Sequence, residues 1–174
     1  MEMLGLVLLV LFGGVALIAL LAAVHLLLPD PVAKTRARLE TGLGRAFLLG
    51  IVNLLFLGAV AFLLVWQAGL IRDNWSGAAA FLSVVLGLLA LVIFLGLAVF
   101  AVNGLTALAA LLGERIGKAK TPFQGDLRGG LLLVLACLTP YVGWFGFTPF
   151  VLSLGLGASI LALLQKKAPA AAKR

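Results

Sequence analysis

Few side chains in this chain are suited to catalysis. Its six carboxylates lie at the chain start or in the connections between apolar runs, at Glu2, Asp30, Glu40, Asp73, Glu114 and Asp126. No two of them form an acid pair at helical spacing. Ionisable groups inside membrane spans are energetically costly and usually mark an ion pathway or an active site. Because the apolar runs contain almost none, we expect neither an enzyme nor a proton-coupled pump.

His25 is the one residue with obvious ligand potential, near the end of the first apolar run. A single histidine can bind haem or a chlorin axially, but bis-histidine ligation needs a second one, which the chain lacks. A lone histidine at this depth more commonly lies at the interface or bonds to a neighbouring helix. We therefore predict no cofactor, and keep a pigment- or haem-binding subunit as an alternative.

The composition indicates an integral membrane protein. The chain is 64% hydrophobic and 11% charged, against averages of about 45–50% and about 25% in soluble domains. Its net charge of +7 lies in short connections beside apolar runs, where anionic lipids attract it. Membrane lipids, and no nucleic acid, are therefore the expected partners of the basic residues.

Four apolar segments define the expected architecture, which is a single membrane domain. About 20 residues cross the hydrocarbon layer as a helix. We predict spans at 3–28, 46–66 and 78–101, the last with an interfacial extension to 112. The first run lacks a basic start and is longer than the apolar core of a signal peptide, about 7–15 residues. It is therefore expected to be a retained span.

The last apolar segment is interrupted between residues 138 and 149. Pro140, Pro149, two glycines and several aromatics make a continuous helix unfavourable there. We predict a helical hairpin with arms at 127–141 and 147–165, followed by a flexible tail at 168–174; a single broken span is the alternative. The fold class is thus an all-α polytopic membrane protein with three transmembrane helices and a C-terminal hairpin.

Basic and aromatic residues predict the orientation. With a hairpin, the three basic clusters, which hold every basic residue except Arg72, all face one side, which the positive-inside rule makes cytoplasmic. They include Lys34, Arg36, Arg38, Arg115, Lys118, Lys120, Lys166 and Lys167. The aromatic anchors fall at the opposite interface, at Trp66, Trp75, Tyr141 and Trp144. We therefore expect a multi-pass protein of the bacterial inner membrane, with its N-terminus outside and its C-terminus in the cytoplasm.

Helix packing is the expected role of the polar and small residues in the apolar segments. Asn53 and Asn103 are expected to hydrogen-bond across helices, since no third polar group lies near them in sequence. Small residues four apart, which allow close helix approach, recur in the last segment at Ser153, Gly155, Gly157 and Ser159. They predict packing within the chain or docking of this helix on a partner. The segment 31–45 fits a short amphipathic helix on the inner leaflet.

Between Gly44 and Leu164 the chain resembles the bacterial integral-membrane domain found after bactofilin-like, polymer-forming cytoskeletal segments. The residues that carry the resemblance are 48–52, 113–117, 138–144 and 154–158. The polymerising part is absent here. The resemblance implies a membrane anchor or scaffold without catalytic residues.

Together these observations favour a non-enzymatic scaffold or accessory subunit that packs against helices of a larger membrane complex. A small transporter or channel, with the broken last segment lining a pathway, is the first alternative. A lipid-modifying enzyme or a pigment-binding subunit that uses His25 is the second.

Overall fold

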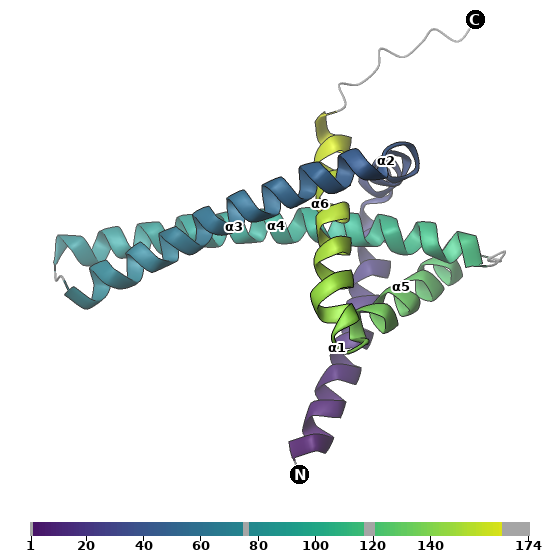
Figure 1. Cartoon of the computed structure of the whole chain (residues 1–174), viewed down its shortest axis with the longest axis horizontal. Coiled ribbons are helices and arrows are strands. Elements are labelled where there is room, and N and C mark those ends of the chain that lie inside the picture. The colour runs from purple at the N-terminus through teal and green to yellow at the C-terminus, as the bar shows by residue number, and fades with distance from the viewer. Residues whose placement is uncertain (1, 75–76, 117–120, 165–174) are drawn as a thin grey trace, which may run out of the picture.

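The computed structural model describes residues 2–74, 77–116 and 121–164, and the part of the chain that it describes is helical throughout apart from short turns (Figure 1). The elements are α1 (Glu2–Leu27), α2 (Pro29–Thr41), α3 (Leu43–Asn74), α4 (Ala78–Ile116), α5 (Pro122–Leu138), the π-helical turn η1 (Val142–Phe147) and α6 (Thr148–Leu164). Four stretches, in α1, α3, α4 and η1–α6, are long and apolar enough to cross a membrane. The expected fold class is confirmed: three long apolar helices precede a C-terminal helical hairpin.

The helix bounds differ from the expected ones in three places. α3 continues past residue 66 to Asn74, and α4 runs unbroken through the expected extension to 112 and ends at Ile116. α5 starts at Pro122, before the expected 127, because Thr121 caps it: the Gln124 N–H donates to Thr121 Oγ1 at 3.4 Å. Proline at the first helical position supports the same start, since its missing N–H would be unpaired there anyway. The expected tail at 168–174 lies outside the described residues.

The break in the last segment is a tight turn followed by a π-helical turn. Tyr141 takes a φ of 63°, a left-handed conformation that non-glycine residues rarely adopt. A Cβ on Gly143 would lie 2.5 Å from the Ala136 carbonyl oxygen, so only glycine fits where the two arms separate. Thr148 Oγ1 donates to the Gly143 carbonyl at 2.7 Å. Pro149 has no N–H to continue the upstream hydrogen bonding, which is consistent with the irregular turn just before it.

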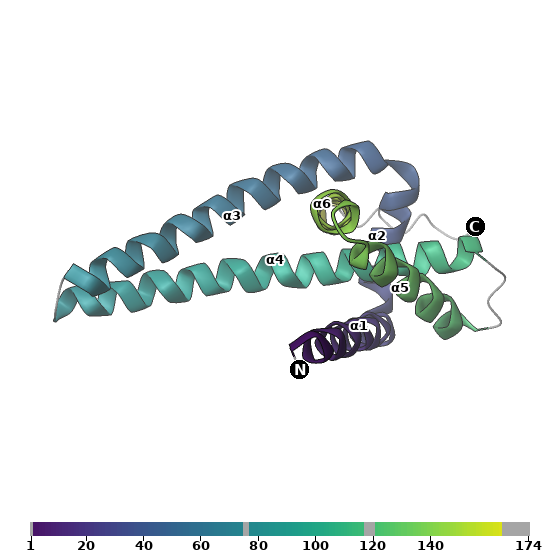
Figure 2. The same ribbon diagram turned by 60° about the horizontal axis from the view of Figure 1, so that its bottom comes forward.

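The helices form two sets that cross one another. α3 and α4 make a long antiparallel hairpin, while α1 and α6 run across it (Figures 1 and 2). The N-terminus of α1 and the turn between α5 and α6 lie on one side of the hairpin, and α2 and the C-terminal end of α6 lie on the other (Figure 1). The core surrounds the second half of α4, where residues 104–110 are all buried, and α1, α2, α5 and α6 all contact α4.

Glycines allow the crossing helices to touch through their backbones. A Cβ on Gly157 of α6 would lie 1.8 Å from the Ala46 carbonyl oxygen of α3, and one on Gly104 of α4 would lie 2.1 Å from the Gly155 carbonyl oxygen. A Cβ on Gly129 of α5 would lie 1.8 Å from a carbonyl oxygen of α4. No side chain fits at these points. Small residues, rather than large apolar ones, therefore determine where α6 and α5 pack.

Candidate functional site: a cavity with a polar end

The short helix α2 brings a polar side chain into contact with the membrane helices. Pro29 and Pro31 lie in its first turn, and it ends at Thr41, with Gly42 as its C-terminal cap. Its buried residues are Val32, Thr35 and Leu39, whose spacing of three and four places them on one face. That face packs on α4 and α6, so the amphipathic segment expected at 31–45 buries its apolar side against protein.

Asn103 is the centre of a polar cluster that joins three helices. Its Nδ2 donates to Thr35 Oγ1 of α2 at 2.9 Å and to Ser159 Oγ of α6 at 3.2 Å. Ser159 Oγ in turn donates to the Phe100 carbonyl at 2.9 Å. Thr35 is 0% and Ser159 2% exposed. The cluster therefore connects α2, α4 and α6 in an otherwise apolar region.

One atom of this cluster has no partner in the described part of the chain. Asn103 Oδ1 is buried and accepts no hydrogen bond. An unsatisfied buried polar group costs about 1–3 kcal/mol, and such groups in native structures often reflect a missing water, ion or ligand. This convergence could not be predicted from the sequence, since Thr35 and Ser159 lie 68 and 56 positions from Asn103.

The cluster forms one end of a cavity of about 620 Å³ between α1, α2, α4 and α6. Leucines, valines and alanines make up most of its lining, and Lys34 is the only charged residue among them. The size lies within the range of about 300–1,000 Å³ that small-molecule sites occupy. Leu28, Val99 and Leu163 line it while being 46%, 64% and 68% exposed, so the rim is apolar. A molecule with an apolar part and a polar end would match this lining.

The other predicted amide is not part of the cavity. Asn53 Nδ2 donates at 2.8 Å to the Leu49 carbonyl one turn earlier in α3. The two asparagines therefore do not share a site. Ser153, which was expected in a packing face, is 1% exposed and its hydroxyl has no partner among the described residues.

His25 lies against α5. Its Nδ1 is 2.5 Å from Asp126 Oδ2, although the two groups are not aligned as a well-directed hydrogen bond. The contact joins α1 to α5 where both are partly buried. Within the described residues, no group of three or more histidine, cysteine or acidic side chains is positioned to hold a metal.

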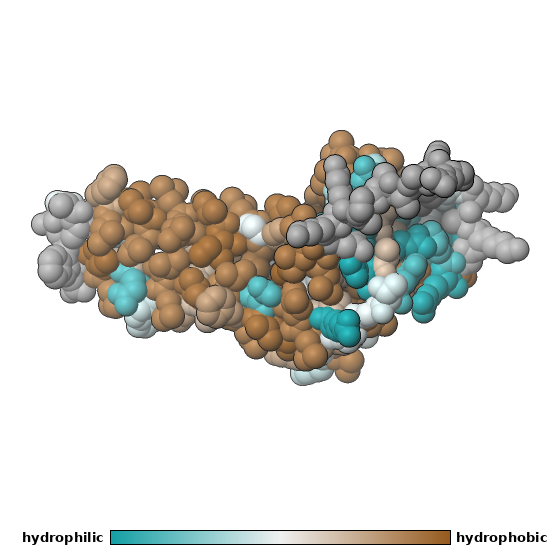
Figure 3. All heavy atoms as spheres, turned by 90° about the horizontal axis from the view of Figure 1, so that it is seen from above, coloured by the Kyte–Doolittle hydropathy of each residue, from teal (hydrophilic) through white to brown (hydrophobic). Residues whose placement is uncertain are grey.

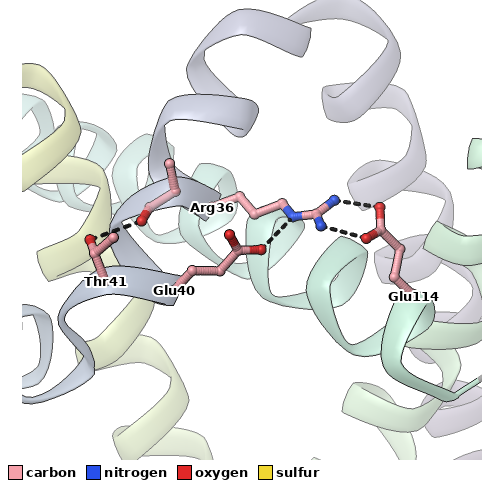
Figure 4. A network of polar contacts seen from close by, with 5 residues as sticks. Arg36, Glu40, Thr41 and Glu114 are labelled. Carbon is pink, nitrogen blue, oxygen red and sulfur yellow. Dashed lines mark hydrogen bonds and ion pairs between the residues drawn. The ribbon is translucent and has the colours of Figure 1, made fainter.

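Arg36 belongs to an ion-pair network rather than standing alone at the membrane surface (Figure 4). Its guanidinium donates through two nitrogens to the carboxylate of Glu114, and Nε donates to Glu40 at 3.2 Å. The hydrogen bonds that Arg36 donates to Glu114, and more weakly to Glu40, raise its pKa, although partial burial opposes them. The network fastens α2 to the end of α4.

The remaining predicted surface residues are only partly described. Trp66, Tyr141 and Trp144 are 57%, 80% and 63% exposed, and Trp66 stacks on Phe62 with ring centroids 6.1 Å apart. Arg115 is exposed, whereas Arg38 is half-buried, and its Nε has no hydrogen-bond partner among the residues that the structure describes. Trp75, Lys118, Lys120, Lys166 and Lys167 lie outside the described residues or side chains.

No protein-family model, curated protein or solved structure matches the chain. The resemblance to the bactofilin-associated membrane domain therefore stays a hypothesis. Arguments about function depend on the chain's own geometry.

Proposed function

We propose that the chain is a non-enzymatic subunit of a bacterial inner-membrane complex, in which its α3–α4 hairpin packs against a transmembrane helix of a partner protein. The observation that supports this is the free length of the hairpin. Beyond its crossing with α6, the hairpin extends away from the other helices (Figures 1 and 2). The face of the hairpin seen in Figure 3 is mostly apolar, and Phe56, Phe81 and Phe94 are 65%, 73% and 64% exposed.

Lipid alone would account for apolar side chains, but not for the glycines. A Cβ on Gly58, Gly69, Gly87 or Gly96 would meet nothing within 4 Å. Glycine inside a helix is less stable than alanine by about 0.8–1 kcal/mol, and lipid offers no compensation. Small residues exposed on a membrane helix are typical of helix–helix contacts, because they let the backbone of another helix approach closely. The hairpin's glycines therefore favour a helical partner.

An apolar notch marks where the partner helix would contact the chain. It has a volume of about 220 Å³ and is lined by residues of α3, α4 and α6, including Leu57, Ile93, Gly96 and Leu156. It lies where α6 crosses the hairpin. A bulky apolar side chain of a partner helix would fill it.

Copurification from mild detergent tests this proposal. We expect Gly96→Leu, which fills the notch, to lose the partner that the unaltered chain retains. Gly13→Leu is the matched control, because Gly13 of α1 also has open space around it, and it should keep the partner. Isolation of the unaltered chain as a lone monomer in every detergent, or equal behaviour of the two variants, would contradict the proposal.

A small transporter is the second candidate, favoured by the cavity at Asn103. Polar groups gathered beside an apolar passage are what a substrate path requires, although the cavity has no charged lining except Lys34. Measurement of flux in proteoliposomes containing the purified chain distinguishes this function from docking.

A further inference from the structure

We infer that the cavity between α1, α2, α4 and α6 binds one acyl chain of an anionic phospholipid, such as phosphatidylglycerol, whose phosphate pairs with Lys34. This site is separate from the notch at Gly96 and does not depend on the docking proposal.

The rim of the cavity indicates whether its occupant enters from the lipid or from water. Leu28, Val99 and Leu163 both line the cavity and are about half or more exposed. They belong to α1, α4 and α6 or border them, and stretches of these three helices are apolar enough to cross a membrane. An opening bordered by apolar side chains on such helices faces hydrocarbon, from which an acyl chain can enter without crossing water.

The charge of the lining selects the headgroup. Lys34 lies at the cavity and is exposed, and no carboxylate is among the lining residues. Among the described carboxylates of this region, Glu40 and Glu114 are engaged by Arg36 and Asp126 by His25. Asp30 lies one turn before Lys34 in α2, but it makes no ion pair with Lys34 and does not line the cavity. Lys34 has no ion pair among the described residues. A lipid phosphate would supply the missing negative charge.

Asn103 does not select the headgroup. Its Oδ1 is buried out of reach of an occupant, and its Nδ2 already donates to Thr35 and Ser159. The occupant thus needs an apolar chain and an anion for Lys34.

Native mass spectrometry of delipidated full-length protein tests the selectivity. We expect phosphatidylglycerol to bind roughly fivefold more tightly than zwitterionic phosphatidylcholine, the ratio that one lysine near an anionic surface provides. Lys34→Gln should abolish that preference. Arg45→Gln, which removes an exposed charge at the start of α3 outside the cavity, should leave it intact. Equal binding of the two lipids, or equal effects of the two substitutions, overturns the inference.

A labelling experiment locates the bound lipid. In a Cys137→Ala background, Val99→Cys places a thiol at the cavity, and Val92→Cys places one on α4 outside it. Phosphatidylglycerol should slow the reaction of an apolar maleimide at position 99 severalfold and leave position 92 unchanged. Glycerol 3-phosphate, which lacks acyl chains, should protect neither. Protection of both positions, of neither, or by glycerol phosphate alone excludes a lipid held in this cavity.

Discussion

At the scale of single residues, the two asparagines show how similar side chains in apolar helices take different roles. Asn103 donates to two other helices, whereas Asn53 bonds to a carbonyl of its own helix. Only the first links elements that are distant in the sequence. The hydrogen bonds of Asn103 therefore stabilise the tertiary structure, whereas the hydrogen bond of Asn53 stabilises only its own helix.

We expect Asn103→Ala to destabilise the folded chain more than Asn53→Ala does. Interhelical hydrogen bonds in membrane proteins average about 0.6 kcal/mol each, so loss of the two bonds from Asn103 predicts about 1 kcal/mol. Asn53→Ala removes one local bond and should change the free energy of unfolding by less than about 0.6 kcal/mol. Unfolding in mixed micelles of increasing SDS content measures both. Equal losses would show that the cluster contributes nothing beyond local bonding.

At the scale of elements, the position of α6 depends on glycines that touch α3 and α4. Gly155 and Gly157 lie two residues apart, on different sides of α6, and contact α4 and α3 respectively. α6 is thereby held at both long helices at once. From the sequence, the small-residue face of the last segment could pack either within the chain or against a partner. In this structure it packs within the chain.

Two glycine-to-alanine substitutions should have opposite effects. Gly157→Ala places a Cβ 1.8 Å from the Ala46 carbonyl oxygen, a backbone atom that cannot turn aside, and overpacking of this kind costs about 1–3 kcal/mol. Gly58→Ala meets nothing within 4 Å, and should stabilise the isolated chain by up to about 1 kcal/mol through helix propensity. The thermal midpoint of each detergent-solubilised variant checks the signs. A tolerated Gly157→Ala would mean that α3 and α6 do not pack backbone to backbone.

At the scale of the whole molecule, the crossing of the two helix sets bears on how the chain spans the membrane. α1 has 26 residues and α3 has 32, which correspond to lengths of about 39 and about 48 Å. Both exceed the hydrocarbon thickness of about 30 Å. Because transmembrane helices tilt by up to about 40°, sets that tilt in opposite directions can both cross the membrane and still cross each other.

We expect the N-terminus and the turn at 139–141 outside, and residues 29–45, 113–128 and the C-terminus in the cytoplasm. The basic clusters support this orientation. In addition, the N-terminus lies at the end of α1 that points away from α2, and the turn between α5 and α6 lies on the same side (Figure 1). Single cysteines at Lys118 and Lys173, in a Cys137→Ala background, should both be labelled only from the cytoplasmic face. Labelling of the two positions from opposite faces would exclude a hairpin and leave a single broken span.

The sequence by itself determined the helical class, the long apolar helices and the break before α6. These features are local: lipid forces each span to satisfy its own backbone hydrogen bonds, and Pro140, Gly143 and Pro149 interrupt that pattern wherever the segment packs. The full length of α3 and α4 could not be predicted, because polar residues such as Asn103 and Gln67 are equally compatible with a continuing helix and with the end of a membrane span.

Tertiary structure alone decided which faces meet. Between helices in lipid there is no hydrophobic driving force, because acyl chains are as apolar as leucine. The sequence of an apolar run therefore does not indicate which helices it contacts. Contact is instead decided by backbone approach at a few glycines, such as Gly157 of α6 against α3 and Gly104 of α4 against α6. That approach brings Thr35 and Ser159 to Asn103 from two other helices, and with them creates the cavity, which no spacing in the sequence could predict.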